Sequence, residues 1–367
     1  MNISDNSGSH QLIINLSILL PQPTGISNYA QNIFPYLKSL EPTLLTSQKS
    51  SEFKCYPVRD NLTPAQGTKG HLRRLLWTQF QLPQIYKNLK SKLLFSPLPE
   101  APLNSNCRFV VMSHDLIPLR FPKRFSPLTP YHRYYIPQVL KQAQHIICNS
   151  QATAQDIIDF YHVSASKITP IPLAYNCQHF RPMREKRREN QRYFLYLGRH
   201  DPYKNLHRLI AAFAALRNRD EYELWLAGPI DKRYTPVLQA QVAELGITQL
   251  VKFLNYVSYN ELPKIIHGAI ALVFPSLWEG FGLPVVEAMA CGTPVITSNL
   301  SSLPEVAADA AILINPYIIA EITDAMQMIA EDMAVRSHLS TLSIKRANQF
   351  SWEKTGLATA EVLSRYL

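Results

Sequence analysis

Short apolar runs alternate with amphipathic helical segments along almost the whole chain of 367 residues. Between most of these runs, apolar residues recur at i, i+3 and i+4, most clearly at 206–218. Parallel strands are joined by helices that cover both faces of their sheet, so the alternation predicts an α/β protein with parallel sheets. The predicted strands are 12–19, 108–114, 145–150, 168–174, 193–198, 222–228, 250–256, 269–276, 294–299 and 311–316.

One highly charged segment, RPMREKRRENQR at 181–192, interrupts this alternation. The chain is also longer than the roughly 100–200 residues of a typical domain. We therefore expect two Rossmann-like, doubly wound domains, residues 1–185 and 186–350, followed by a C-terminal helix at 351–367 with Ser351 as its N-cap. Facing domains of this kind would bring the carboxyl ends of their strands to one cleft, where open α/β sheets bind ligands.

The net charge of +10 belongs to the first half of the chain. Residues 1–185 hold 19 Lys and Arg against 9 Asp and Glu, whereas residues 186–367 hold 18 of each. Such asymmetry indicates a negatively charged partner, either a membrane surface or a nucleic acid. The basic segments 71–95 and 120–125 also contain Leu, Trp and Phe, which suits anionic lipid headgroups. Alternatively, their apolar residues point inward and their charges are simply solvated.

Cellular location is indicated by what the sequence lacks. It has no apolar run long enough to span a membrane, no secretion pattern at its start, and an odd number of cysteines without a CxxC pair. We expect a cytoplasmic protein, with any membrane contact peripheral to the inner face.

Polar and glycine residues follow several predicted strands. In LWEGFGLP, Gly280 and Gly282 allow a sharp turn, Pro284 suits the first turn of a helix, and free N–H groups there can hold a phosphate. An ordinary strand–turn–helix joint would look the same. Arg199 and Lys204 follow another strand and suit a diphosphate leaving group, unless they are plain surface charges.

Two weaker signals lie in the first half. His114 ends a predicted strand and could donate a hydrogen bond to a substrate hydroxyl, or be buried and satisfied within the protein. Gly25 stands in a loop before a predicted helix and could belong to a plain turn.

Taken together, these segments resemble the retaining glycosyltransferases of family 4, which have the GT-B fold. The resemblance extends from about Ile13 to the C-terminus. It is carried by EGFGLPVVE with two glutamates separated by seven residues, and by further segments at 290–296, 301–311, 196–205, 112–119, 146–157 and 351–354. It implies two Rossmann-like domains facing across a cleft, with the C-terminal helix crossing back to the first.

The resemblance also assigns roles to individual residues. Glu279 would contact hydroxyls of the donor sugar, and Glu287 would accept hydrogen bonds from the nucleotide ribose, because a carboxylate offers paired acceptors to vicinal hydroxyls. The diphosphate between them would be held by backbone N–H groups, Arg199 and Lys204. The expected catalytic residues are His114, Arg199, Lys204 and Glu279, and the expected donor-binding residues are Gly25, Gly280, Phe281, Gly282, Leu283, Glu287, Tyr256 and Val257.

The implied reaction moves a hexose from a nucleotide sugar to a glycan or lipid-linked glycan, with retention of anomeric configuration and without a metal or other cofactor. GDP-mannose is the first candidate donor, and UDP-glucose or another hexosyl donor stays open. The chain departs from the family pattern at 174–180, Asn255, Ala308 and the single Gly25. None of these positions belongs to the donor core, and the first and last leave acceptor-side details open.

Three other classes of protein fit the sequence less well. A dinucleotide oxidoreductase would need G-x-G-x-x-G with a later acidic residue, and that pattern is absent. A nucleic-acid-binding protein would need a reader motif or stacking platform, which we do not find, so no nucleic acid partner is expected. A catalytically inactive partner subunit with the same fold is disfavoured because Glu279, Glu287, Arg199 and Lys204 are intact.

Overall fold

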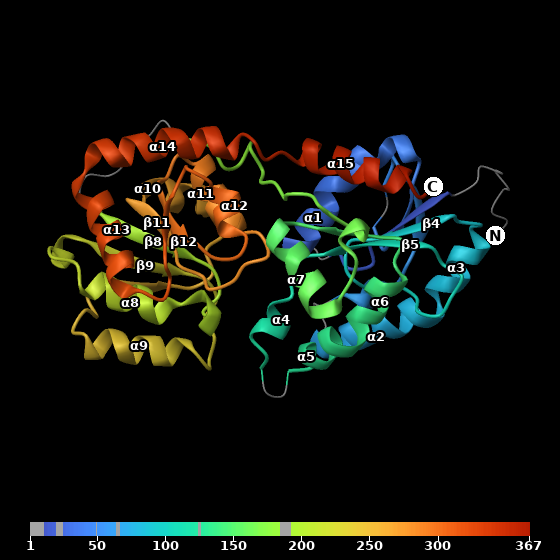
Figure 1. Cartoon of the computed structure of the whole chain (residues 1–367), viewed down its shortest axis with the longest axis horizontal. Coiled ribbons are helices and arrows are strands. Elements are labelled where there is room, and N and C mark those ends of the chain that lie inside the picture. Colours follow the sequence, from blue (N-terminus) through green and yellow to red (C-terminus); the bar gives the residue numbers. More distant parts are fainter. Residues whose placement is uncertain (1–10, 20–24, 49, 64–66, 124–125, 184–191) are drawn as a thin grey trace. The chain divides into compact units, whose positions relative to one another are not determined.

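The computed structural model describes residues 11–19, 25–48, 50–63, 67–123, 126–183 and 192–367 (Figure 1). The chain divides into two compact units. Unit 1 comprises residues 1–173 and 352–367, and unit 2 comprises residues 174–351. The boundary expected at residue 185 lies outside the described residues, and the division falls earlier, between Leu173 and Ala174.

Unit 1 is built on a seven-stranded parallel sheet with the order β3-β2-β1-β4-β5-β6-β7. Its central strands are fully buried, whereas the edge strand β3 carries exposed residues and ends at a proline, which is tolerated at an edge. The strands are β1 (Leu12–Asn15), β2 (Thr43–Thr46), β3 (Lys54–Pro57), β4 (Leu93–Ser96), β5 (Phe109–Ser113), β6 (His145–Cys148) and β7 (Ile168–Pro170).

Helices connect these strands, and their apolar residues contribute to the core of unit 1. They are α1 (Gly25–Ile33), α2 (Gly67–Phe80), α3 (Leu82–Asn88), α4 (Ile117–Arg120), α5 (Leu128–Pro130), α6 (Ile136–Gln142) and α7 (Gln151–Tyr161). The π-helical turn η4 (Tyr131–Tyr135) joins α5 to α6, and shorter 3-10 turns are η1 (Phe34–Leu40), η2 (Asp60–Leu62) and η5 (Ala165–Lys167).

Unit 2 has a six-stranded parallel sheet with the order β10-β9-β8-β11-β12-β13. Its strands are β8 (Tyr193–Leu197), β9 (Glu223–Ala227), β10 (Val251–Leu254), β11 (Ala271–Phe274), β12 (Val295–Ser298) and β13 (Ile312–Ile314). Its helices are α8 (Leu206–Ala214), α9 (Thr235–Glu244), α10 (Leu262–Gly268), α11 (Leu283–Ala290), α12 (Leu303–Ala307), α13 (Ile319–Glu331) and α14 (Met333–Ala347), with 3-10 turns η6 (Pro202–Lys204), η7 (Arg219–Glu221) and η8 (Tyr259–Glu261).

The residues just after the division belong to unit 2 because of an aromatic contact. The ring of His179 stacks on Tyr259 with centroids 3.9 Å apart, and its Nε2–H donates to the Tyr259 carbonyl oxygen at 2.7 Å. Phe180 is buried and packs edge-on against the same tyrosine. These contacts fix the chain before the charged segment, which explains why the division precedes residue 185.

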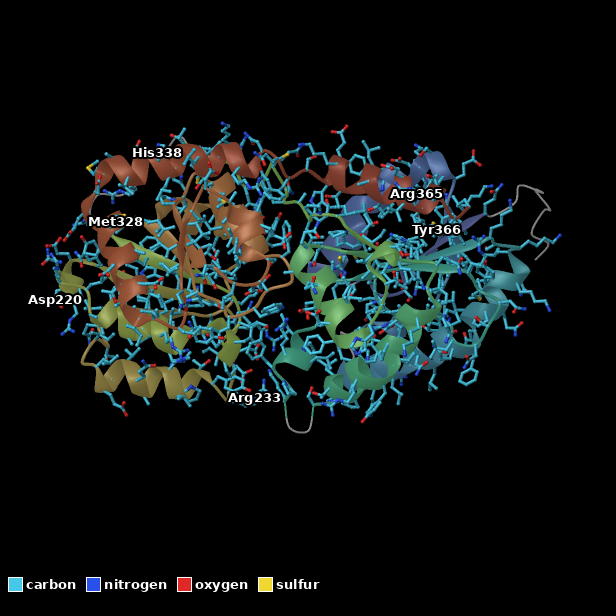
Figure 2. The ribbon with its side chains drawn as sticks, viewed as in Figure 1. Asp220, Arg233, Met328, His338, Arg365 and Tyr366 are labelled. Atoms are coloured by element: carbon cyan, nitrogen blue, oxygen red, sulfur yellow. The ribbon has the colours of Figure 1, made fainter. Side chains whose placement is uncertain are left out.

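The last helix, α15 (Trp352–Ser364), is part of unit 1. The Thr355 hydroxyl donates to the Pro172 carbonyl oxygen at 2.8 Å, and Gly356 lies so close to Tyr36 that an added Cβ would be 2.5 Å from the tyrosine Cβ. Beyond the helix, the Tyr366 hydroxyl lies 2.9 Å from Nδ1 of His145 on β6 (Tyr366 is labelled in Figure 2). The C-terminal segment is therefore anchored to the first sheet.

Each sheet reverses its strand order at one point. In unit 1 the reversal lies between β1 and β4, and in unit 2 between β8 and β11. Loops leaving two neighbouring strands in opposite directions open a crevice at their carboxyl ends, where ligands of doubly wound sheets bind. The expected α/β class with two Rossmann-like parallel sheets is confirmed, and these two positions are where functional residues are expected to gather.

Candidate functional site

In unit 2, the two strands at the reversal carry the polar residues that the sequence singled out. Strands β8 and β11 are paired in parallel, with Phe194 opposite Ala271, so their carboxyl ends lie at the same edge. The loop after β8 contains Arg199 and Lys204, and the loop after β11 contains the glycine-rich turn that starts at Glu279. Residues far apart in the sequence therefore meet at the binding edge of this sheet.

The two loops meet in a buried ion pair. Nζ of Lys204 donates to Oε1 of Glu279 at 2.5 Å, and both side chains are almost fully buried. The ammonium group also lies 5.4 Å from the ring centroid of Phe274, the last residue of β11. Removing two charges from water is costly, so such a pair is seldom kept for stability alone. Its place at the reversal point indicates a functional role.

Neighbouring residues that the sequence analysis did not identify hold this pair in position. Asn205 is buried in the left-handed region at φ 64°, and its Nδ2 donates to the carbonyl oxygens of Pro275 at 3.1 Å and Pro316 at 2.7 Å. The Leu277 N–H donates to the Tyr203 carbonyl oxygen at 2.7 Å. The Lys204 loop is thus tied directly to the Glu279 loop. An asparagine in the turn before a helix was the available signal.

Two serines fix the glycine-rich turn from the other side. The Glu279 N–H donates to Oγ of Ser301 at 3.0 Å, and the Ser302 hydroxyl lies 3.0 Å from the Glu279 carbonyl oxygen and 2.9 Å from that of Phe281. Both serines stand just before α12. The backbone from Glu279 to Phe281 is therefore preorganised without any ligand, as a binding turn requires.

The turn leaves backbone donors available at the start of α11. Within the described part of the chain, the N–H groups of Phe281 and Gly282 donate to no other residue. The helix dipole adds positive character at the same place, which favours an anion such as a phosphate. The Phe281 side chain instead is buried against Phe350, at a centroid distance of 5.7 Å. A bound nucleotide sugar would therefore contact the backbone of Phe281 and not its side chain, together with the backbone of Gly280, Gly282 and Leu283.

Gly282 is required by its backbone conformation, and its replacement should be costly. It caps α11 at φ 106°, a conformation that side chains disfavour, and an added Cβ would lie 2.8 Å from Cδ2 of Leu303. We expect Gly282→Ala to destabilise unit 2 by about 1–3 kcal/mol. A thermal melt should show a lower midpoint, and a variant that melts like the wild type would contradict the proposed strain. Gly246→Ala, also at positive φ but with open space around it, is the matched control.

Glu287 lies on the same helix, one turn beyond the glycines. It is half-buried, no other described residue gives its carboxylate a hydrogen bond, and no cation compensates its charge. Desolvation raises the pKa of Glu287 to about 8. A partly exposed carboxyl group without partners in the free protein is well suited to a ligand that supplies hydroxyl donors.

The other predicted donor residues of unit 2 lie apart from the ion pair. The Arg199 side chain is 65% exposed and pairs with Oδ2 of the buried Asp201 at 3.0 Å, so it does not join Lys204 and Glu279 in the free protein. Tyr256 and Val257 follow β10 at the sheet edge, and Tyr256 is 76% exposed. The structure therefore brings together Lys204, Glu279 and the glycine turn.

In unit 1, His114 directly follows β5 and has a defined tautomer. Its Nε2 lies 2.9 Å from the Pro97 carbonyl oxygen, which can only accept, so Nε2 carries a proton. Burial lowers the pKa of His114 to about 4, so the ring is neutral and Nδ1 is an acceptor. The sequence suggested that His114 donates a hydrogen bond to a substrate hydroxyl. In this tautomer His114 would instead accept a hydrogen bond from such a hydroxyl, through Nδ1. Gly25 begins α1, and the loop before it lies outside the described residues.

His114 lines a pocket of about 490 Å³ in unit 1. Its lining includes residues that follow β4 and β5 and the start of α1, namely Ile26, Leu98, Pro99, Glu100, His114 and Asp115. The pocket therefore lies where the strand order of this sheet reverses. Glu100 is neutralised by a bidentate pair with Arg74, at 2.7 and 2.8 Å. Burial lowers the pKa of His132, another lining residue, to about 4, and its buried Nδ1 has no partner in the described structure. The pocket is mainly apolar, and its lining offers the neutral Nδ1 of His114 and the carboxylate of Asp115 as hydrogen-bond acceptors.

The described residues contain neither a metal-binding cluster nor a membrane-spanning helix. No group of three or more His, Cys, Asp and Glu side chains there is arranged to hold a metal ion. No helix in the part of the chain that the structure covers is long and apolar enough to cross a bilayer.

Comparison with known proteins identifies the family. Residues 180–346 match the glycosyl transferases group 1 and residues 23–179 match the glycosyltransferase family 4. The chain is 30% identical over 321 residues to the O-antigen chain mannosyltransferase RfbU of Salmonella typhimurium, covering 83% of this chain and 87% of that protein. The chain belongs to glycosyltransferase family 4. The resemblance read from the sequence is thereby confirmed, and the protein is a glycosyltransferase.

Further similarities support the family 4 assignment. The O-antigen chain mannosyltransferase B of Escherichia coli is 30% identical over 247 residues, which cover 64% of each chain. Among solved structures, Anabaena HepE in complex with UDP-glucose superposes with a TM-score of 0.75 over 97% of this chain and 99% of that one, at 18% identity. At that identity the superposition shows the fold alone, which confirms the GT-B architecture of this family 4 member.

Proposed function

We propose that this family 4 glycosyltransferase moves a hexose, with mannose from GDP-mannose as the first candidate, to a glycan or lipid-linked glycan in surface-polysaccharide synthesis. The proposal rests on one structural observation above all. At the reversal point of unit 2, the Lys204–Glu279 pair lies beside a glycine turn with available N–H donors. The similarity to two O-antigen chain mannosyltransferases supports the choice of sugar and pathway.

The proposed chemistry follows from these charges. The bond between the anomeric carbon and the diphosphate breaks, and its electron pair leaves with the diphosphate. Lys204, the N–H groups of Phe281 and Gly282, and Arg199 after rotation of its exposed side chain would stabilise the growing negative charge. The acceptor oxygen bonds to the anomeric carbon on the face that the diphosphate leaves, so configuration is retained, and its proton passes to the departing diphosphate. No metal or cofactor has a part in this scheme.

The donor sugar and ribose would be held by the two glutamates. Glu279 would accept from sugar hydroxyls while keeping Lys204 oriented, and Glu287 would accept from the ribose hydroxyls. Tyr256 and Val257 would contact the base, and His114 would accept from a sugar hydroxyl through Nδ1. All of these roles belong to the proposal and are open to substitution tests.

The acceptor is assigned to the pocket of unit 1. Its apolar wall suits the faces of sugar rings, and the carboxylate of Asp115 in its lining can accept hydrogen bonds from hydroxyl groups. The proposal places the enzyme in the cytoplasm, in peripheral contact with an anionic membrane where a lipid-linked acceptor would lie. It includes no nucleic acid partner.

A panel of nucleotides tests the donor assignment. Thermal melts would be recorded with GDP, UDP, ADP and their sugar conjugates, with and without EDTA. A ligand at 100 times its Kd stabilises a protein by about 2.7 kcal/mol, which is readily measured. Selective stabilisation by GDP and GDP-mannose, unchanged by EDTA, is expected. Stabilisation by UDP-glucose would select that alternative donor, and no stabilisation by any nucleotide would favour an inactive subunit.

Nucleotide affinity should depend on pH through Glu287. The pKa of this carboxyl is raised to about 8 from a usual 4.5, so in the free protein it is largely protonated at neutral pH. The ribose favours the charged form, so the association constant should rise as pH approaches 8 and level off above it. Calorimetric titrations with GDP across this range should show the rise in the wild type. In Glu287→Gln, only the pH dependence that comes from the nucleotide phosphate should remain. Equal pH profiles for the wild type and the variant would refute the assignment of Glu287 to the ribose.

A further inference from the structure

One face of α2 exposes apolar side chains in a regular stripe. Leu72, Leu76 and Phe80 are 56%, 51% and 71% exposed, whereas Trp77 and Thr78 on the same helix are buried. Successive residues of an α-helix are rotated by about 100°, so these three side chains fall within an arc of about 80°. The stripe therefore lies on the side of the helix turned away from the core of unit 1.

Cations accompany this stripe. The exposed Lys69 and Arg73 fall on the same face by helical spacing. Gln81 keeps right-handed helical angles, φ −92° and ψ −40°, so the face continues into α3, where Lys87 is exposed. No acidic residue occurs between Asp60 and Glu100, and the buried Glu100 already pairs with Arg74. The face is therefore apolar along its centre, with cations at both ends and along one side.

Another exposed apolar group provides a contrast. On unit 2, Met328 and Met333 are also exposed, but Glu331 and Asp332 lie between them in the sequence (Met328 is labelled in Figure 2). An acidic surround would repel an anionic membrane, whereas the basic surround of the α2 stripe attracts one. Charge complementarity therefore selects an anionic lipid bilayer as the occupant of the α2 face.

We propose that Lys69, Leu72, Arg73, Leu76 and Phe80 form a docking face that lies flat on an anionic lipid bilayer. The apolar side chains enter the boundary between headgroups and acyl chains, and the cations contact lipid phosphates. This inference rests on the proposed function, which needs access to a lipid-linked acceptor. His71, on the same helix, lines the acceptor pocket, so docking would keep that pocket within about one helix diameter, ~10 Å, of the bilayer.

Vesicle binding tests the docking face. The full-length protein would be sedimented with vesicles of phosphatidylcholine alone and of equal parts phosphatidylcholine and phosphatidylglycerol. The wild type should bind only the anionic vesicles, less strongly at high salt. The triple variant L72Q/L76Q/F80Q should lose about tenfold or more of this binding, because it lacks the inserted apolar surface. K69Q/K87Q should also weaken it, through the lost cations.

Leu357→Gln is the matched control, because Leu357 lies on α15 of the same unit and is 54% exposed, close to the value for Leu76. It should bind vesicles like the wild type. Equal binding by the triple variant and the wild type would overturn the proposal. A second result would also overturn the proposal: the wild type binds no vesicles but self-associates, and the triple variant abolishes the self-association. The face would then bind a second copy of the chain.

Stabilisation by nucleotide, measured without vesicles, separates this inference from the proposed function. The triple variant should keep the wild-type response, which also shows that it is folded. A wild type that binds vesicles but no nucleotide would refute the proposed function and leave the docking face supported. A wild type that binds nucleotide but no anionic vesicles would refute the docking face alone.

Discussion

Replacing Lys204 by methionine should lower turnover by about 100-fold or more. Methionine keeps much of the side-chain volume but removes the charge that would face the leaving diphosphate, and loss of one preorganised electrostatic contact commonly costs 10²–10³ in rate. The measurement is the initial rate of nucleotide diphosphate release in the presence of acceptor. Lys252→Met is the matched control, because Lys252 is also an ion-paired lysine of unit 2, bonded to Glu223 at 2.8 Å. That variant should keep the wild-type rate.

A second variant separates catalysis from folding in this experiment. Lys204→Met leaves Glu279 buried without its partner, which by itself destabilises a protein by about 3–5 kcal/mol. The double variant Lys204→Met/Glu279→Gln removes both charges and should recover much of that stability in a thermal melt. Its turnover should stay low. If the double variant regained activity together with stability, or if Lys204→Met stayed within about threefold of the wild type, the pair would be structural.

Above pH 8, where the Glu287 carboxyl is charged, substituting it by glutamine should weaken nucleotide binding by about 10- to 100-fold. Hydrogen bonds to a charged group contribute about 1.5–3 kcal/mol, and the neutral amide cannot accept both ribose hydroxyls as a carboxylate does. Calorimetric titration with GDP gives the dissociation constant directly. Because the substitution removes a desolvated carboxyl, the free variant should be at least as stable as the wild type above pH 8.

Two comparisons complete the Glu287 test. The 2′,3′-dideoxy nucleotide lacks the ribose hydroxyls, so it should bind wild type and variant equally. Glu321→Gln, a carboxylate on α13 that accepts from the Asn315 N–H at 2.7 Å, should bind nucleotide normally. Wild-type affinity in Glu287→Gln would show that this carboxylate does not bind the ribose.

The sequence predicted the sheet core well because buried parallel strands are recognisable without tertiary information. Each predicted apolar run contains a strand, although the strands are shorter than the runs. Three strands of unit 1 were missed. β4 follows α3 with only Lys90, in the left-handed region at φ 51°, to mark the end of the helix, and lysine gives no such signal. β2 and β3 are short and lie toward the edge of the sheet, where the apolar pattern is weak.

The meeting of Lys204 with Glu279 could be predicted only in part. The sequence placed both residues after strands, but the pairing of β8 with β11 is a property of the strand order, which periodicity does not encode. The supporting contacts of Asn205, Ser301 and Ser302 depend on the same neighbourhood. Arg199 was expected beside Lys204, yet its side chain turns to Asp201, an acidic neighbour two residues away.

The α2 segment shows why a hydrophobic pattern alone was ambiguous. In residues 71–95, Trp77, Leu82 and Ile85 are buried in the core, whereas Leu72, Leu76 and Phe80 are exposed. The contact with anionic lipid that the sequence suggested for this segment stays a prediction. On its inward side, α2 buries two polar residues, Arg74 and Thr78. The charge of Arg74 is neutralised there by Glu100. Periodicity identifies the faces of a helix, but it does not show that Arg74 is buried against Glu100, which lies 26 residues further along the chain.

A crystal structure with a bound nucleoside diphosphate would test the central claim most directly. The account predicts a β-phosphate within hydrogen-bond distance of Lys204 Nζ and of the N–H groups of Phe281 and Gly282, with the ribose hydroxyls on the Glu287 carboxylate. A nucleotide bound elsewhere, or one whose phosphates leave the Lys204–Glu279 pair and the glycine turn untouched, would contradict it.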